Sequence, residues 1–337
     1  MTHRTQRGID VATHVCQLHG VDERGHTVLR RRISRTHLRP FVAQLRPALV
    51  GIEACGSAHY WAREWRALGH DVRLIAPQFV APYRKNDKHD GNDAEAICEA
   101  VGRPHMRFVP VKEVEQQAVL TVHRARQLLV AERTALVNQT RGLLAEYGLI
   151  VSTGVGVLRR ALPALLESPT LPGLARDVCA DLADRWRALD ERIASYDRRV
   201  TQLAQQTEPA QRLMQAPGVG PVTATALVAT VGDARTFKNG RQFAAWLGLV
   251  PRQHSSGGTR RLGRITKRGD VYLRTLLIHG ARAVMRHLAR RTDATSRWVL
   301  ALKARRGFNK AVVALAAKQA RVLWALLATG RPYVACP

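Results

Sequence analysis

An acidic island stands out in a chain that is otherwise strongly basic. The 337 residues include 53 Lys or Arg and 26 Asp or Glu, yet four carboxylates fall within nine residues, at Asp87, Asp90, Asp93 and Glu95. Two carboxylates about 4 Å apart repel by about 4 kcal/mol near a protein surface, and a divalent cation between them reverses the sign. The island therefore indicates either a metal site or a capped surface helix whose acidic residues lie at its positive N-terminal end.

Two further carboxylates lie at apolar segments that are typical of strands. Asp10 stands between Ile9 and Val11, and Glu53 ends the apolar run 48–53. A buried, unpaired carboxylate is costly, so we expect a cation or hydrogen-bond donors near Asp10. If the two strands are neighbours, the two carboxylates meet on one sheet.

The acidic island can join this pair. Asp90 or Asn92 can cap a helix that follows, which places Asp90 at its N-terminus and Asp93 in its first turn. If this helix packs across the sheet, Asp10, Glu53, Asp90 and Asp93 converge with no arginine among them. Such a group holds one or two Mg²⁺ ions. A salt-bridged Asp10 is the competing interpretation.

A second candidate site lies in the segment 243–270. Ser255 and Ser256 precede two glycines, and cationic side chains surround them at Arg252, Arg260, Arg261, Arg264, Lys267 and Arg268. Guanidinium groups hold phosphates in bidentate geometry, and a hydroxyl on a flexible loop among them can attack one. His254 is not expected to act as the base, because adjacent side chains in an extended loop point apart.

A third motif is the glycine pair Gly218 and Gly220, which has the pattern of a helix-hairpin-helix turn. Such a turn leaves backbone amides free at the start of the next helix, where a phosphate binds without base contacts. The alternative is a glycine-rich connector that only packs.

The elements that position these residues follow from hydrophobic periodicity. Strands expected within 8–32, at 48–53 and at 71–75, with helices at 38–45 and 58–68, predict a mixed sheet covered by helices on both faces. Segment 113–206 is typical of two long helices joined by a proline-interrupted connector, which makes an antiparallel arm. The remainder is mostly helical. We expect domains at 1–110, 111–206 and 207–337.

Composition restricts the partners. A formal net charge of +27 and a pI near 11.3 indicate a polyanion, and nucleic acid is favoured over a membrane surface because Lys and Arg are spread along the chain. We find neither a run of 18 apolar residues nor a signal peptide, so we expect a cytoplasmic, nucleoid-associated protein. The five cysteines show no Cys-x-x-Cys pair and predict reduced thiols rather than zinc ligands.

Taken together, these blocks resemble the DEDD-type insertion-sequence transposases. That family is related to the pilin-gene inverting recombinase, and its characterised members are bridge-RNA-guided recombinases. The resemblance covers nearly the whole chain in the same order. It is carried by Gly8-Ile9-Asp10, Gly51-Ile52-Glu53-Ala54-Cys55-Gly56, Lys88-His89-Asp90-Gly91-Asn92-Asp93-Ala94-Glu95-Ala96, Ala216-Pro217-Gly218-Val219-Gly220, His254-Ser255-Ser256-Gly257-Gly258 and Ile265-Thr266-Lys267-Arg268-Gly269-Asp270.

The resemblance implies a RuvC-like domain of the ribonuclease-H fold at 1–110, with Asp10, Glu53, Asp90 and Asp93 as a DEDD tetrad that binds Mg²⁺. Asp87 competes for the third position, but the three-residue spacing of Asp90 and Asp93 favours that pair. The arm would support dimers and contact RNA.

The resemblance also implies a C-terminal serine that attacks DNA and forms a covalent phosphoserine. Counting forward from Pro251 favours Ser256, and counting back from Ile265 favours Ser255. Because more than 160 residues separate the serines from the acids, the site would form by domain docking or between subunits. The implied partners are DNA, a structured guide RNA, and further copies in a homodimer or homotetramer.

Two other functions fit the same residues. A Holliday-junction resolvase-like nuclease uses metal-bound water and needs no serine. A non-catalytic nucleic-acid-binding protein would keep the basic surface with a degenerate acid site.

Overall fold

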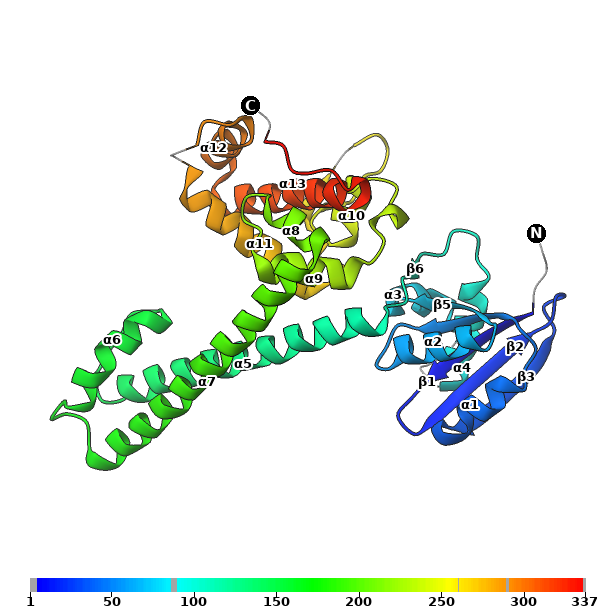
Figure 1. Cartoon of the computed structure of the whole chain (residues 1–337), viewed down its shortest axis with the longest axis horizontal. Coiled ribbons are helices and arrows are strands. Elements are labelled where there is room, and N and C mark those ends of the chain that lie inside the picture. The colour runs from blue at the N-terminus through cyan, green and yellow to red at the C-terminus, as the bar shows by residue number, and fades with distance from the viewer. Residues whose placement is uncertain (1–4, 86–89, 260, 289–290, 336–337) are drawn as a thin grey trace. The chain divides into compact units, whose positions relative to one another are not determined.

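The computed structural model describes residues 5–85, 90–259, 261–288 and 291–335 (Figure 1). The chain divides into two compact units, Met1–Val114 and Glu115–Pro337. The first unit ends close to the domain boundary expected at 110. The boundary expected at 206 falls inside the second unit and stays a prediction.

A mixed sheet forms the centre of the first unit, with strand order β3-β2-β1-β4-β5-β6. Strands β1 (Gln6–Val11), β2 (Val15–Val21) and β3 (Thr27–Ser34) form an antiparallel meander. Strands β4 (Leu49–Glu53) and β5 (Asp71–Ile75) continue in parallel with β1, and the short β6 (Phe108–Val109) pairs antiparallel with β5. The predicted mixed sheet is confirmed, although β6 was not expected.

Helices cover both faces of this sheet, as predicted. Helices α1 (Arg35–Ala43) and α2 (Ala58–Ala67) share one core with the inward row of the strands, which includes Ile9, Leu18 and Ile52. Helix α4 (Asp90–Val101) covers the opposite face. The short α3 (Pro77–Val80) and a 3₁₀ turn at Ala81–Tyr83 connect β5 towards α4.

Helix α4 lies directly on two glycines of the sheet. A Cβ atom at Gly8 would stand 2.1 Å from the Ala94 carbonyl oxygen, and one at Gly51 would stand 2.9 Å from the Cβ of Val101. Both contacts are shorter than van der Waals packing allows. Only glycine therefore lets the helix approach β1 and β4 this closely.

The second unit begins with an arm of two long antiparallel helices (Figure 1). Helices α5 (Val114–Ala145) and α7 (Gly173–Gln206) are joined by ion pairs Arg126–Asp197 (2.5 Å) and Arg133–Asp190 (3.1 Å), which fix the antiparallel register. The connector contains a further helix, α6 (Val155–Leu166), with Pro163 inside it. Leu158 in α6 is fully buried, which shows that packing outweighs the proline's cost to the helix.

The rest of the second unit is helical except for one exposed β-ribbon. Strands β7 (Pro251–Gln253) and β8 (Leu262–Ile265) form the ribbon where we expected a loop. The helical elements are α8 (Glu208–Met214), α9 (Pro221–Val231), a 3₁₀ turn at Ala234–Thr236, α10 (Gly240–Trp246), α11 (Val271–Arg286), α12 (Ala294–Arg306) and α13 (Phe308–Thr329).

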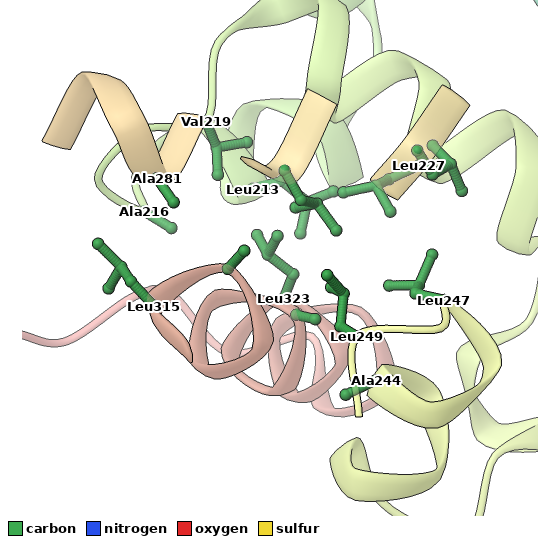
Figure 2. Close-up of a cluster of buried hydrophobic side chains, with 14 of the residues drawn as sticks. Leu213, Ala216, Val219, Leu227, Ala244, Leu247, Leu249, Ala281, Leu315 and Leu323 are labelled. Carbon is green, nitrogen blue, oxygen red and sulfur yellow. The ribbon is translucent and has the colours of Figure 1, made fainter. Parts of the chain in front are cut away.

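Helix α13 is the centre of the second unit's core. Leu315 and Leu323 from α13 meet Leu213, Leu227 and Leu247 from the surrounding elements (Figure 2). Within the described residues, α13 is the one helix long and apolar enough to cross a membrane by length and composition, with a mean hydropathy of 1.5. Its buried face against α10, α11 and α12 is that of a core helix.

A buried histidine joins the arm to this core. His123 on α5 is 1% exposed, and its two ring nitrogens form hydrogen bonds with the Thr225 hydroxyl on α9 (2.9 Å) and the Tyr272 hydroxyl on α11 (3.1 Å). Burial lowers the pKa of His123 to about 4. The imidazole is therefore neutral in the folded protein at neutral pH.

The close approach of α4 makes Gly8 sensitive to substitution. We expect Gly8→Ala to destabilise the first unit by about 1–3 kcal/mol, because the added methyl group pushes α4 off β1. Gly56→Ala is the matched control, because a Cβ at Gly56 meets nothing within 4 Å. Urea unfolding of both variants measures the difference, and equal stabilities would contradict the proposed close packing.

The buried imidazole should make stability depend on pH. The unfolded chain, with an ordinary histidine pKa near 6.5, takes up a proton before the folded protein does. The contribution of His123 is thus complete above about pH 6.5 and falls as the pH drops towards 4. Between pH 7 and pH 4 we expect the wild-type protein to lose up to about 3 kcal/mol more than His123→Gln in urea unfolding. Parallel pH profiles would show that the imidazole does not titrate in this way.

Candidate active site

The carboxyl ends of β1 and β4 bring Asp10 and Glu53 together. The parallel register pairs Gly8 with Gly51 and Ile9 with Ile52, so Asp10 and Glu53 are the next residues along the two strands. Each follows its glycine by two residues and shares its face of the sheet. Burial raises the pKa of the neighbouring Cys55 thiol, and Glu53 and then Asp10 raise it further. Both carboxylates thus affect the same thiol.

The contacts of α4 show where its first turn lies. Cys98 donates its thiol proton to the carbonyl oxygen of Gln6 at 3.6 Å, whereas Gly8 faces Ala94 and Cys98. Moving two residues along β1 therefore moves about one turn back along α4. The next step places Asp10 opposite the first turn of α4, which begins at Asp90. The side chain of Asp90 and all of Asp87 lie outside the described residues.

Asp93 is held by an arginine. Its side chain is 10% exposed, and its Oδ1 accepts a charge-assisted hydrogen bond from Nε of Arg84 at 2.5 Å. We had expected carboxylates with no arginine among them, so the structure corrects that expectation at Asp93. A carboxylate has two oxygens, and an arginine on one of them orients the group for a ligand on the other.

The described side chains include no group of three or more His, Cys, Asp or Glu residues that could hold a metal ion. That set includes Asp10, Glu53 and Asp93 but not Asp90. The donor chemistry of the neighbouring pair nevertheless fits Mg²⁺, which prefers carboxylate oxygens and usually binds through one or two of them.

The predicted serines lie at the exposed tip of the β7–β8 ribbon. The Ser255 hydroxyl accepts a hydrogen bond from the Arg261 backbone N–H at 3.2 Å, and the Ser256 carbonyl accepts one from the Thr259 N–H at 3.0 Å. The latter bond closes a tight turn over Gly257 and Gly258, which have φ of 55° and 79°. An open hollow is lined by both serines, His254, Thr259 and Arg261.

Cationic side chains follow the same ribbon. Arg252, Arg261, Arg264, Lys267 and Arg268 are all exposed, and Arg260 lies outside the described residues. The backbone of Lys267 and Arg268 packs against Gly248, where a Cβ would stand 2.1 Å from the Arg268 carbonyl oxygen. The base of the ribbon is thus fixed to the helical core, and its charges face solvent.

The two glycines of the helix-hairpin-helix pattern have different surroundings. Gly218, with φ of 79°, packs against α11, where a Cβ would stand 2.6 Å from the Gly280 carbonyl oxygen. Gly220 is exposed and precedes α9. Packing accounts for Gly218, and a phosphate contact at Gly220 stays a prediction.

Comparison with known proteins identifies the family. A DEDD transposase profile of the IS110 group matches residues 7–149, and the profile of the transposase IS116/IS110/IS902 family matches residues 210–297. A probable family 20 transposase of Pseudomonas aeruginosa is 57% identical over 95% of this chain and 96% of its own length. This chain belongs to the IS110-type DEDD transposases.

Two further relatives span nearly the whole transposase. The transposase for insertion sequence element IS1111A of Coxiella burnetii is 45% identical over 97% of this chain and 90% of its own length. The transposase for insertion sequence element IS1328 of Yersinia enterocolitica is 39% identical over 98% of both chains. The predicted family is thus confirmed, and the mixed α/β first unit is compatible with a ribonuclease-H-like DEDD domain.

The charge of the transposase is concentrated in its C-terminal part. Residues 209–337 contain 23 Lys or Arg but only three carboxylates, Asp233, Asp270 and Asp293. Each of the three accepts a backbone N–H at the start of a helical segment, from Arg235, Leu273 and Ser296 respectively. Carboxylates are therefore present here only where they cap a helix, and the remaining charged surface is cationic.

Two of these features were not predicted from the sequence, although the first has a clear sequence signal. The capping role of Asp270 and Asp293 was readable, because each stands immediately before a helical pattern. The pairing of Arg84 with Asp93 had no sequence signal, because the two residues are not at a helical spacing and meet only through the path of the intervening chain.

Proposed function

We propose that this insertion-sequence transposase cuts and rejoins DNA with one or two Mg²⁺ ions held by Asp10, Glu53, Asp90 and Asp93. The supporting observation is the pairing of Asp10 and Glu53 at the ends of adjacent parallel strands, opposite the first turn of α4. When bound, the metal supplies positive charge to the scissile phosphate and to the leaving oxygen. The carboxylates hold it, and Arg84 orients Asp93.

A serine, Ser255 or Ser256, is the proposed nucleophile. Its Oγ attacks the scissile phosphorus and loses its proton, and the bond from phosphorus to one DNA oxygen breaks as that oxygen gains a proton. The phosphate stays on the serine until a DNA hydroxyl attacks it, which restores the serine and joins the new strand. Both steps exchange one P–O ester for another, so no external energy source is needed. The ribbon's exposed cations neutralise charge that develops on the phosphate.

Each of the three predicted domains has a role in this reaction. Region 1–110 is the metal-binding RuvC-like domain, 111–206 is the arm, and 207–337 carries the serine. The cationic C-terminal part binds DNA phosphates, and a structured guide RNA binds through its phosphates and shape. Because acids and serine belong to different units, both must reach one phosphodiester on the bound DNA. We propose that a homodimer or homotetramer provides this arrangement.

The acids can be tested directly. We expect Asp10→Ala and Asp93→Ala each to lower strand cleavage by about 100-fold or more, because each removes a ligand of the metal ion that stabilises charge at the reacting phosphate. The measurement is cleavage of labelled DNA that carries the element's ends, with Mg²⁺ and RNA from the native locus. Asp184→Ala is the control, because Asp184 is an exposed residue paired with Arg187 on α7. Wild-type cleavage by both acid variants would rule out the metal proposal.

A serine nucleophile would form a covalent phosphoserine intermediate with DNA. With Mg²⁺ we expect a DNA–protein adduct that survives denaturation and carries phosphate on one serine, as peptide mass spectrometry would show. Ser255→Ala or Ser256→Ala should abolish it, whereas Ser152→Ala, at an exposed position in the same unit, should not. Cleavage without any adduct would instead support a nuclease that uses water, and DNA binding without cleavage would support a non-catalytic protein.

A further inference from the structure

Arg35, the first residue of α1, makes three contacts at the carboxyl ends of β1 and β4. Its Nη1 donates to the Ala12 carbonyl oxygen at 2.9 Å, and its Nη2 donates to the Ser57 hydroxyl at 2.8 Å. Its guanidinium also lies over the ring of Trp61, 5.5 Å from the centroid. The backbone N–H of Arg35 donates to the backbone carbonyl oxygen of His14 at 2.9 Å, which fixes the start of α1 to the turn after β1.

The two side-chain hydrogen bonds join Arg35 to the segments that directly follow the two paired carboxylates. Ala12 comes two residues after Asp10, and Ser57 comes four residues after Glu53. Ser57 has φ of 68°, a left-handed conformation that costs a residue with a side chain about 1–2 kcal/mol. Such a conformation persists only where surrounding contacts impose it. The bond from Arg35 is one of those contacts.

The Arg35 side chain also lines open surface at these strand ends. Two open hollows at these strand ends share Thr13 and Arg35 in their linings. Arg35 therefore stands where a ligand of an α/β sheet is expected, at the carboxyl ends of its strands.

We propose that Arg35 is a positioning residue for the metal site. It ties the loop after Asp10 to the loop after Glu53 and so holds the two carboxylates at the separation that a shared cation requires. The inference rests on the metal site of the proposed function. Groups that orient metal ligands without binding the metal themselves typically affect metal affinity by about 10- to 100-fold.

The chain offers a matched set of variants. Arg35→Gln removes both side-chain bonds and the charge. Ser57→Gly removes only the acceptor hydroxyl, and glycine adopts the left-handed conformation without strain, so any loss reports the missing bond. Arg39→Gln is the control, because Arg39 lies one turn later on α1 and pairs with Glu64 at 2.7 Å on the surface. Arg35→Lys keeps the charge with a different donor geometry.

Binding of Mn²⁺ to the full-length variants, followed by electron paramagnetic resonance without DNA, measures the effect. We expect Arg35→Gln to weaken Mn²⁺ binding by about 10-fold or more, Ser57→Gly to weaken it less, and Arg39→Gln to leave it unchanged. Thermal melting and circular dichroism confirm folding. If Arg35→Gln does not fold, Ser57→Gly and Arg35→Lys carry the test, with weakened binding expected in both.

Three outcomes would overturn the inference. The first is that Arg35→Gln binds Mn²⁺ as tightly as Arg39→Gln, which would show that the Arg35 hydrogen bonds do not position the acids. If Arg35→Gln does not fold, the same result for Ser57→Gly and Arg35→Lys would show this instead. Weakened DNA binding with intact Mn²⁺ binding would make Arg35 a DNA contact instead. Absence of Mn²⁺ binding by the wild-type protein would contradict the metal site itself, and so the proposed function as well.

Discussion

The contact between α4 and two glycines is the constraint on which the candidate site of the first unit depends. With no side chains at Gly8 and Gly51, the helix rests on the backbone of β1 and β4, and its first turn reaches the strand ends where Asp10 and Glu53 lie. A larger residue at either position would lift the helix and carry its acidic first turn away from the sheet. The site is therefore as much a product of two absent side chains as of the carboxylates.

Electrostatic balance sets the second constraint. Carboxylates at neighbouring strand ends, such as Asp10 and Glu53, repel each other, and arginines lie nearby. Arg84 pairs with Asp93, and Arg35 donates hydrogen bonds to Ala12 and Ser57, in the segments that follow Asp10 and Glu53. These arginines offset part of the repulsion between the carboxylates. In the proposed metal site they would also set the orientation of the carboxylates.

The strands and helices of this arrangement could be predicted from the sequence, because they depend on hydrophobic periodicity and helix capping. Alternating apolar residues predicted the strands that bear Asp10 and Glu53, and a capping pattern predicted the helix that bears Asp93. The Arg84 partner could not be predicted, because it depends on the path of the chain between β5 and α4. The β7–β8 ribbon was missed because its strands are exposed on both faces and show no apolar alternation. Helix α6 was hidden by Pro163, whose helix-breaking tendency is overcome by the burial of Leu158.

The three carboxylates of the C-terminal part have a consequence for the lifetime of the protein. Because Asp233, Asp270 and Asp293 are committed to helix starts, the surface there has almost no internal counter-charge. A free copy bears the resulting self-repulsion, and a copy loaded with nucleic acid does not. A nucleic acid that binds only the folded protein therefore stabilises it. This stabilisation grows with the ratio of the nucleic-acid concentration to the dissociation constant of the complex. Loaded copies should resist proteases longer than empty ones, which couples the persistence of the transposase to the nucleic acid it meets.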